Sequence, residues 1–154
     1  MHALRGRGPA KSIEKDINDI LSSTHLPATK RKALIEARIG QGRFRRGVLK
    51  RWNQGCAVTG CTALEALRAS HIKPWRTCDD RERLDPENGL PLIATLDALF
   101  DRHLVSFNDD GLILISRTLD DELSALGINR KMRIKGRLTP RQKALLAEHR
   151  RNLA

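Results

Sequence analysis

The sequence predicts an α+β protein in which helices at both ends of the chain flank a central region of short strands. Apolar residues recur at helical spacing before residue 52, and Thr139 followed by Pro140 is a helix-start signal near the other end. Between them, the segment FNDDGLILIS places two strand-like runs around a turn, which is typical of a β-hairpin. A length of 154 residues suits one domain with a modest core and a helical arm.

Two helices are predicted near the N-terminus. Residues 1–11 are rich in Gly, Pro and Arg, and we expect them to be mobile. Ser12 is suited to cap a helix that runs to about residue 22, and Thr29 a second helix that runs to about residue 39. Gly40 and Gly42 are expected to end the second helix. Residues 1–40 are therefore predicted to be a flexible segment and a helical arm, through which the protein forms a homodimer or binds a partner module.

A third helix is predicted for the basic segment GRFRRGVLKRWNQG. Its apolar positions recur at helical spacing and form a buried stripe: Phe44, Val48, Leu49 and Trp52. Residues 42–54 contain no acid, so the basic side chains of this helix lack local partners. They form a solvated face or contact phosphate groups. The candidate nucleic-acid contacts are Arg43, Arg45, Arg46, Lys50 and Arg51, together with Lys73 further along the chain.

The following segments alternate between apolar and polar stretches. CAVTGC is short, apolar and ends in a turn, and residues 63–72 fit either a strand or a short helix followed by a strand. KPWRTCDDRERLDPENG is interpreted as a polar loop. Helices are predicted over residues 93–103 and 119–126. The basic stretch NRKMRIKGR then precedes the last helix, which Thr139 caps.

Charge is the strongest global signal in the composition. The chain has 29 Lys and Arg against 18 Asp and Glu, a formal net charge of +11. Such an excess favours a polyanionic partner, because neutralising phosphates releases condensed counterions. We therefore expect nucleic acid as the partner; an ordinary basic protein and one that touches anionic lipid are the alternatives.

The sequence also predicts the cellular compartment. Neither a membrane-spanning apolar run nor a signal peptide is predicted. Cys56, Cys61 and Cys78 do not have the spacing of zinc ligands, so we interpret them as reduced, structural thiols. These features favour a cytoplasmic protein without contact with membranes.

Four polar residues of the central region form a candidate catalytic set. His71 ends an apolar segment, Asn88 closes the polar loop, and Asp97 and Asp101 are four residues apart, on one face of a helix. Two carboxylates on one face suit a hard divalent cation such as Mg²⁺. An imidazole, with its ordinary pKa of about 6.5, suits general-base work at neutral pH. An Asn amide is able to orient such a base.

The segment from about residue 37 to residue 116 resembles the HNH endonucleases. The motifs that carry the resemblance follow one another in the order of the family: ARIGQGRFRRGVLKRW, CAVTG, ASHIKPW, RLDPENGLPL and LDALFDRHLVSFNDDG. The resemblance implies an HNH nuclease domain over residues 41–118, with residues 119–154 as a basic helical extension. It also implies a ββα-metal core, in which two antiparallel strands and a helix surround one divalent cation.

The resemblance assigns a role to each candidate. His71 corresponds to the general base that activates water, and Asn88 to the residue that holds the loop and orients the base. Asp97 corresponds to a metal ligand, with Asp101 one turn further on. The implied activity is Mg²⁺-dependent hydrolysis of DNA phosphodiester bonds with little sequence specificity, Mn²⁺ and Ni²⁺ being alternative metals. A role in restriction and defence against foreign DNA is also implied.

Two positions depart from the family pattern. Ser70 stands where many relatives carry Asp or His as a second metal ligand, which lowers the expected affinity for metal. His103 replaces a glycine, and we interpret it as a tolerated surface change. Because of Ser70, a catalytically weakened nucleic-acid-binding module is the alternative to an active nuclease. A structural zinc domain is disfavoured by the cysteine spacing.

Overall fold

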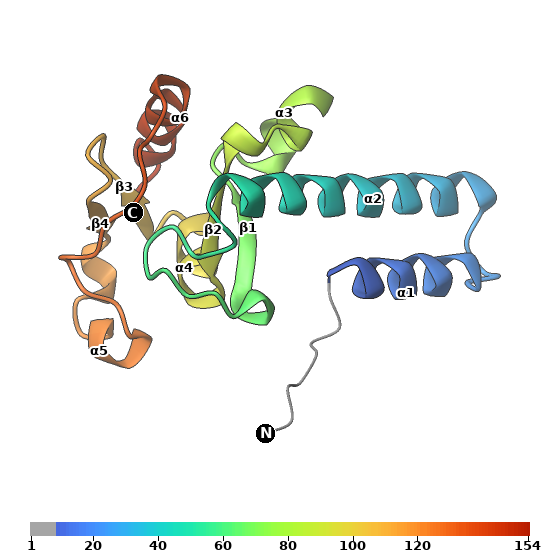
Figure 1. The fold of residues 1–154 in the computed structure, drawn as a ribbon, viewed down its shortest axis with the longest axis horizontal. Coiled ribbons are helices and arrows are strands. Elements are labelled where there is room, and N and C mark those ends of the chain that lie inside the picture. The colour runs from blue at the N-terminus through green and yellow to red at the C-terminus, as the bar shows by residue number, and fades with distance from the viewer. Residues whose placement is uncertain (1–8) are drawn as a thin grey trace.

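The computed structural model describes residues 9–154, with side chains from residue 13 onward. Residues 1–8, most of the segment expected to be mobile, lie outside this range. The described elements mix helices with two small antiparallel sheets, which confirms the α+β class. Helices α1 (Pro9–Leu21) and α2 (Ala28–Arg51) come first. They run side by side and extend away from the rest of the molecule as an arm (Figure 1).

The predicted break between two helices at Gly40 and Gly42 is wrong, because α2 is one continuous helix. A glycine inside a helix costs about 1 kcal/mol relative to alanine, and in α2 it allows close packing at two positions. A Cβ on Gly42 would lie 2.3 Å from the Cδ1 atom of Ile13 in α1. A Cβ on Gly47 would lie 2.6 Å from the ring of Pro86. Glycines in α2 thus let neighbouring elements approach the helix, and the expected boundary at residue 40 falls inside it.

The predicted helix caps are partly wrong at the N-terminus. Ser12 lies inside α1, which begins at Pro9. Pro27, and not Thr29, occupies the N-cap position of α2, where no side chain caps the helix. At the C-terminus the prediction is confirmed. Thr139 caps α6 (Pro140–Arg150) and forms a reciprocal capping box with Gln142.

The first sheet joins β1 (Leu67–His71) to β2 (Gly89–Ile93) in antiparallel register, with His71 opposite Gly89. A single 3₁₀ turn, Leu64–Ala66, precedes β1, so the helix-plus-strand alternative is confirmed. Helix α4 (Ala94–Asp101) follows β2 directly and packs on β1, in place of the longer helix predicted over residues 93–103. The chain therefore builds two antiparallel strands and a helix in the order β1, β2, α4.

The polar segment between β1 and β2 is more ordered than predicted. It contains the short helix α3 (Asp80–Leu84), which the sequence interpretation missed. Asp79 caps α3 through the backbone N–H of Glu82, and the side chain of Glu82 accepts a hydrogen bond from the backbone of Asp79. A 3₁₀ turn, Pro86–Asn88, then leads into β2. Asp-x-x-Glu is a capping box, which was the available signal for this helix.

The second sheet is the predicted hairpin. Strands β3 (Val105–Phe107) and β4 (Ile113–Ile115) pair in antiparallel register, and Gly111 in the connecting turn has a φ of 81°. Only the short helix α5 (Leu123–Leu126) and a 3₁₀ turn form over residues 117–126. Side chains from both sheets, α4 and α6 share one core: among its fully buried members are Leu67, Leu92, Leu96, Phe107 and Leu146.

Helix α6 is anchored to α4 and β3 by a buried histidine. His149 stacks on Phe100 of α4, with ring centroids 3.9 Å apart. Its Nε2 donates to the backbone carbonyl of Phe100 (2.8 Å), and its Nδ1 accepts from the hydroxyl of Ser106 (2.8 Å). Burial lowers the pKa of His149 to about 4, so the ring is neutral at physiological pH.

His103 is not the surface change that was expected. Its side chain is half-buried, and its ring centroid lies 4.3 Å from that of His149. The φ of His103 is 56°, in the left-handed region that favours glycine. A histidine adopts this backbone conformation at a cost, and its ring packs against His149.

Candidate active site

His71 is the last residue of β1, and the local packing places α2 directly beside it. Gly89, its partner in β2, has no side chain, and a Cβ there would lie 2.5 Å from Val48 and 2.6 Å from the ring of Phe44. The missing side chain lets α2 close on the strand pair. Phe44 consequently stacks on the imidazole, with centroids 3.8 Å apart, while Trp75 contacts it edge-on at 5.5 Å.

The protonation of His71 follows from one hydrogen bond. Its Nε2 lies 2.9 Å from the backbone carbonyl oxygen of Arg83. A carbonyl oxygen only accepts, so Nε2 carries the proton and Nδ1 of the neutral ring keeps a lone pair. The pKa of His71 is lowered, first by burial, and the bond to Arg83 opposes this only in part. The ring is thus neutral near pH 7 and has one nitrogen ready to accept a proton.

Asn88 is fully buried and holds the two ends of the loop between the strands together. Its Oδ1 accepts from the backbone N–H of Lys73 (2.8 Å), and its Nδ2 donates to the carbonyl of Glu82 (3.2 Å). The same Nδ2 lies 3.4 Å from the buried thiol of Cys78. Asn88 makes no direct hydrogen bond to His71, but it fixes Glu82, the neighbour of the residue whose carbonyl binds the imidazole.

Asp97 projects from α4 toward β1. Its Oδ1 accepts a short hydrogen bond, 2.5 Å, from the buried hydroxyl of Ser70. Asp97 itself is half-buried, whereas Asp101, at the C-terminal end of α4, is exposed. Ser70 and His71 are neighbours on β1, so their side chains leave the strand in opposite directions, one toward α4 and the other toward α2. The hydroxyl of Ser70 and the imidazole of His71 therefore come from adjacent residues at the end of β1, and the carboxylate of Asp97 reaches Ser70 from α4.

The site around Asp97 offers few protein ligands for a metal ion. Within residues 9–154 no group of three or more His, Cys, Asp or Glu side chains is arranged to hold a metal ion. One half-buried carboxylate beside a hydroxyl fits Mg²⁺, which usually takes one or two carboxylates and completes its shell with water and substrate phosphate. It does not fit a structural zinc site, which needs four protein ligands. All three cysteines are free thiols.

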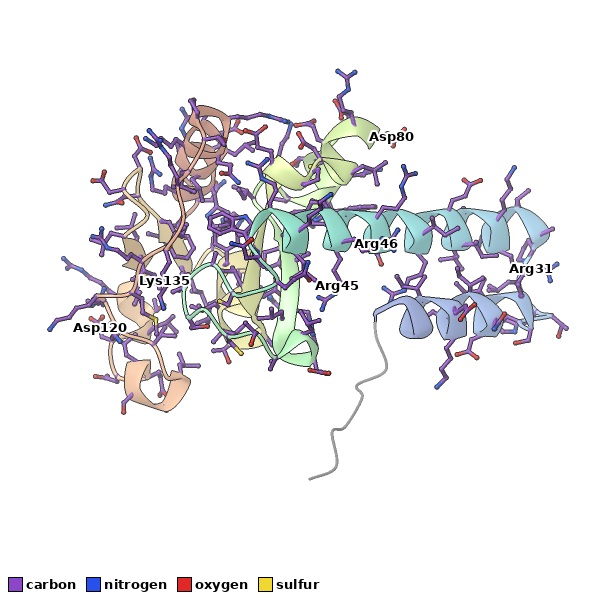
Figure 2. The ribbon with its side chains drawn as sticks, in the orientation of Figure 1. Arg31, Arg45, Arg46, Asp80, Asp120 and Lys135 are labelled. Atoms are coloured by element: carbon purple, nitrogen blue, oxygen red, sulfur yellow. The ribbon has the colours of Figure 1, made fainter. Side chains whose placement is uncertain are left out.

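The candidate phosphate contacts fall into two groups. Four of them are exposed on α2: Arg43, Arg46, Lys50 and Arg51. The other two already have partners. Arg45 donates to the carbonyls of Leu67 (2.7 Å) and Leu64 (2.8 Å), so it joins α2 to the start of β1, where Figure 2 shows it between the helix and the strand. Lys73 forms an ion pair with Glu82, 2.7 Å apart.

Sequence reasoning missed several groups that shape this site. Phe44 was interpreted only as part of a buried stripe, yet its ring covers one face of His71. The backbone carbonyl of Arg83 and the ring of Trp75 were not considered either. A hydrogen bond to a backbone carbonyl cannot be predicted from residue type. Only the position of Phe44 on the inner face of a helix indicated that its side chain contacts the rest of the protein.

Comparison with known protein families supports the resemblance that the motifs indicated. The HNH endonuclease family matches residues 56–108, a segment that contains β1, β2, α4 and β3 and excludes the arm and α6. A search of curated proteins found no match. None of the helices in the described part of the chain has the length and apolar character needed to cross a membrane. Residues 56–108, with the strand pair and the helix that bring His71, Asn88 and Asp97 into one region, are therefore a match to the HNH endonuclease family.

Proposed function

We propose that the protein is a metal-dependent DNA endonuclease in which His71 is the general base. The observation that carries this proposal is the hydrogen bond from Nε2 of His71 to the carbonyl of Arg83. It leaves Nδ1 with a lone pair, while burial lowers the pKa of the ring and keeps it neutral near pH 7. Nδ1 would accept the proton of the water that attacks the phosphodiester.

Asn88 is a positioning residue in this proposal. Its three contacts fix the loop that presents the Arg83 carbonyl to the imidazole. Without this loop geometry, the ring would be free to rotate or to exchange its tautomer. The HNH family match and the place of Asn88 between β1 and β2 support the role.

Asp97 is the proposed ligand of a divalent cation, with Ser70 beside it and Asp101 one turn further along α4. A bound divalent cation supplies Lewis-acid stabilisation for the charge that develops on the phosphate and on the leaving 3′ oxygen. Mg²⁺ is the first candidate because the donors are oxygens and few; Mn²⁺ and Ni²⁺ are the alternatives. The hydroxyl of Ser70 supplies a weaker donor than the acid of many relatives.

The exposed cations of α2 are the proposed contacts for the DNA backbone: Arg43, Arg46, Lys50 and Arg51. Contacts of this kind supply affinity without reading bases, so low sequence specificity is expected. Arg45 is left out because two backbone carbonyls already occupy its guanidinium. Lys73 would reach phosphate only by exchanging its ion pair with Glu82. A role in restriction of foreign DNA stays a prediction from the resemblance.

A second candidate function rests on Ser70. Ser70 donates a hydrogen bond to Asp97 at the position where many relatives carry a second metal ligand. Because a missing ligand weakens metal binding, a domain that binds DNA without cleaving it is the alternative. A plasmid assay separates the two. Supercoiled DNA is incubated with wild-type or His71→Ala protein in Mg²⁺, Mn²⁺ or Ni²⁺. Nicking by wild-type protein and its loss by at least roughly 100-fold in His71→Ala supports the nuclease. Gel-shift binding without cleavage in any metal supports the alternative.

A further inference from the structure

The arm carries far more charge than its packing uses. Helix α2 contains nine basic residues and one acid, Glu36, within 24 residues. Its side toward α1 is partly neutralised, because Arg38 forms an ion pair with Asp16 at 2.6 Å. The cations on its other sides extend from the nuclease-like region to the far end of the arm, where Arg31 is labelled in Figure 2. All of α2 lies outside residues 56–108, the segment that matches the HNH family.

Three of these cations fall on one line. Lys32, Arg43 and Lys50 are eleven and seven residues apart, which is close to three and two full turns of an α-helix. All three are exposed, and among residues 9–154 none of them has an ion-pair partner. At a rise of about 1.5 Å per residue the row spans about 27 Å. We call Lys32, Arg43 and Lys50 the arm stripe.

The arm stripe lies on the same helix as Phe44, whose ring covers His71. Arg43 precedes Phe44, whose ring lies on His71, and Lys50 is near the C-terminal end of α2, beside the core. Lys32 lies at the distal end, on the part of α2 that extends beyond the strands (Figure 1). A ligand that follows the stripe from Lys50 toward Lys32 thus runs along α2, from the end that packs on the core to the distal end of the arm.

The geometry points to duplex DNA as this ligand. A B-form duplex carries one negative charge per about 1.7 Å of its axis, so a straight row of cations about 27 Å long meets many phosphates. An anionic membrane fits less well. A helix that lies on a membrane needs an apolar face toward the lipid. Phe44, Val48 and Leu49 of α2 are buried in the protein, and its exposed apolar residues Leu34 and Ile39 are five residues apart, on different faces of the helix.

We propose that α2 is a DNA-tracking arm, whose stripe binds the backbone of the duplex beyond the cleavage site and extends the footprint of the protein. The proposal rests on the proposed nuclease function, since that function supplies the DNA. Glu36 lies four residues after Lys32, on nearly the same line, and is exposed. Its negative charge lowers the attraction of the arm stripe for phosphate, so removing this charge is expected to tighten DNA binding.

The experiment measures binding of full-length protein to a 30-bp fluorescent duplex by anisotropy, in EDTA and at several salt concentrations. Lys32→Gln is expected to weaken binding, and the slope of log K against log salt becomes shallower by about 0.9 for one lost phosphate contact. Over a fourfold range of salt this difference amounts to roughly threefold in affinity. Glu36→Gln is expected to tighten binding. Lys15→Gln, which removes one charge from the exposed surface of α1, is the matched control and leaves both values unchanged.

Two results would overturn the tracking arm. Binding by Lys32→Gln that equals wild-type binding excludes the distal contact, and equal losses in Lys32→Gln and Lys15→Gln show an effect of net charge alone. Because EDTA prevents cleavage, binding is independent of activity. If wild-type protein nicks plasmid and Lys32→Gln binds the duplex as tightly as wild type, the DNA-tracking arm is refuted and the nuclease proposal stands. If Lys32→Gln weakens binding but wild-type protein nicks plasmid in none of the metals, the nuclease proposal is refuted and the arm proposal stands.

Discussion

The imidazole of His71 lies flat against the ring of Phe44, with centroids 3.8 Å apart and the planes inclined by 8°. Phe44 belongs to α2 and is 2% exposed, so the helix shields one whole face of the imidazole from water. Burial is the largest cause of the lowered pKa of His71. The arm helix and the candidate base are therefore coupled: α2 carries exposed cations on its outer side, and on its inner side Phe44 contributes to the burial that lowers the pKa of His71.

Phe44→Leu is expected to raise the pKa of His71 toward its ordinary value, because water gains access to the ring face. The base works only when neutral, so activity is lost as the pH falls through this pKa, and in the variant the loss begins at higher pH. An NMR titration of the imidazole and a pH–rate profile of plasmid nicking measure the shift. Phe107→Leu, which replaces an equally buried aromatic ring in β3, is the control and is expected to leave the pKa of His71 unchanged. If the acid side of the pH–rate profile of Phe44→Leu lies at the same pH as in wild type, the coupling between Phe44 and the pKa of His71 is refuted.

Ser70→Asp is expected to make the stability of the protein depend on metal. A second carboxylate beside Asp97 replaces a hydroxyl donor, and the two negative charges repel in a buried site. We expect the free energy of unfolding in EDTA to fall by about 1–3 kcal/mol, with recovery in millimolar Mg²⁺ or Mn²⁺. Denaturant melts with and without metal test this. Ser70→Ala removes the donor without adding charge, and metal rescue of that variant to the same extent would contradict the prediction.

Arg43 and Arg45 are two residues apart on α2 but have different expected effects. Arg45→Gln withdraws donors from the carbonyls of Leu64 and Leu67 and is expected to cost about 1–3 kcal/mol of stability. Arg43 is exposed, so Arg43→Gln is expected to stay within about 0.5 kcal/mol of wild type and to weaken DNA binding. Urea melts and anisotropy titrations on both variants separate the roles. A DNA-binding defect without destabilisation in Arg45→Gln would reverse the assignment.

Residue type predicted the cap of the last helix, the hairpin and the α+β class, where the signal was local. Thr139 with Pro140 and the turn before Gly111 are examples, since their partners lie within a few residues. The continuity of α2 could not be predicted in this way. Gly42 is usually a helix breaker, and only the side chain of Ile13 from another helix makes its lack of a Cβ favourable. Tertiary contact overrides propensity at such positions.

In the candidate site, too, local features were predicted and tertiary contacts were not. The order and types of His71, Asn88 and Asp97 were readable from the sequence, and all three lie within residues 56–108, which match the HNH endonuclease family. The groups that fix them were not readable. His71 and Asn88 bind backbone atoms of the intervening loop, and every residue except proline offers the same backbone groups. Asp97 binds Ser70, a residue that was interpreted only as a missing ligand.

The anchor of α6 is expected to make the protein sensitive to acid. His149 has an ordinary pKa of 6.5 when unfolded and about 4 when folded. The unfolded state therefore takes up a proton first as the pH falls, so the contribution of neutral His149 to stability is complete above about pH 6.5 and is lost between there and about pH 4. The loss amounts to roughly 3 kcal/mol. Melts of wild type and His149→Gln between pH 7 and 4 test this, because the variant has no such proton to take up. His25→Gln, which removes an exposed histidine, is the control and keeps the wild-type pH dependence. An equally steep loss in His149→Gln would show that another group is responsible.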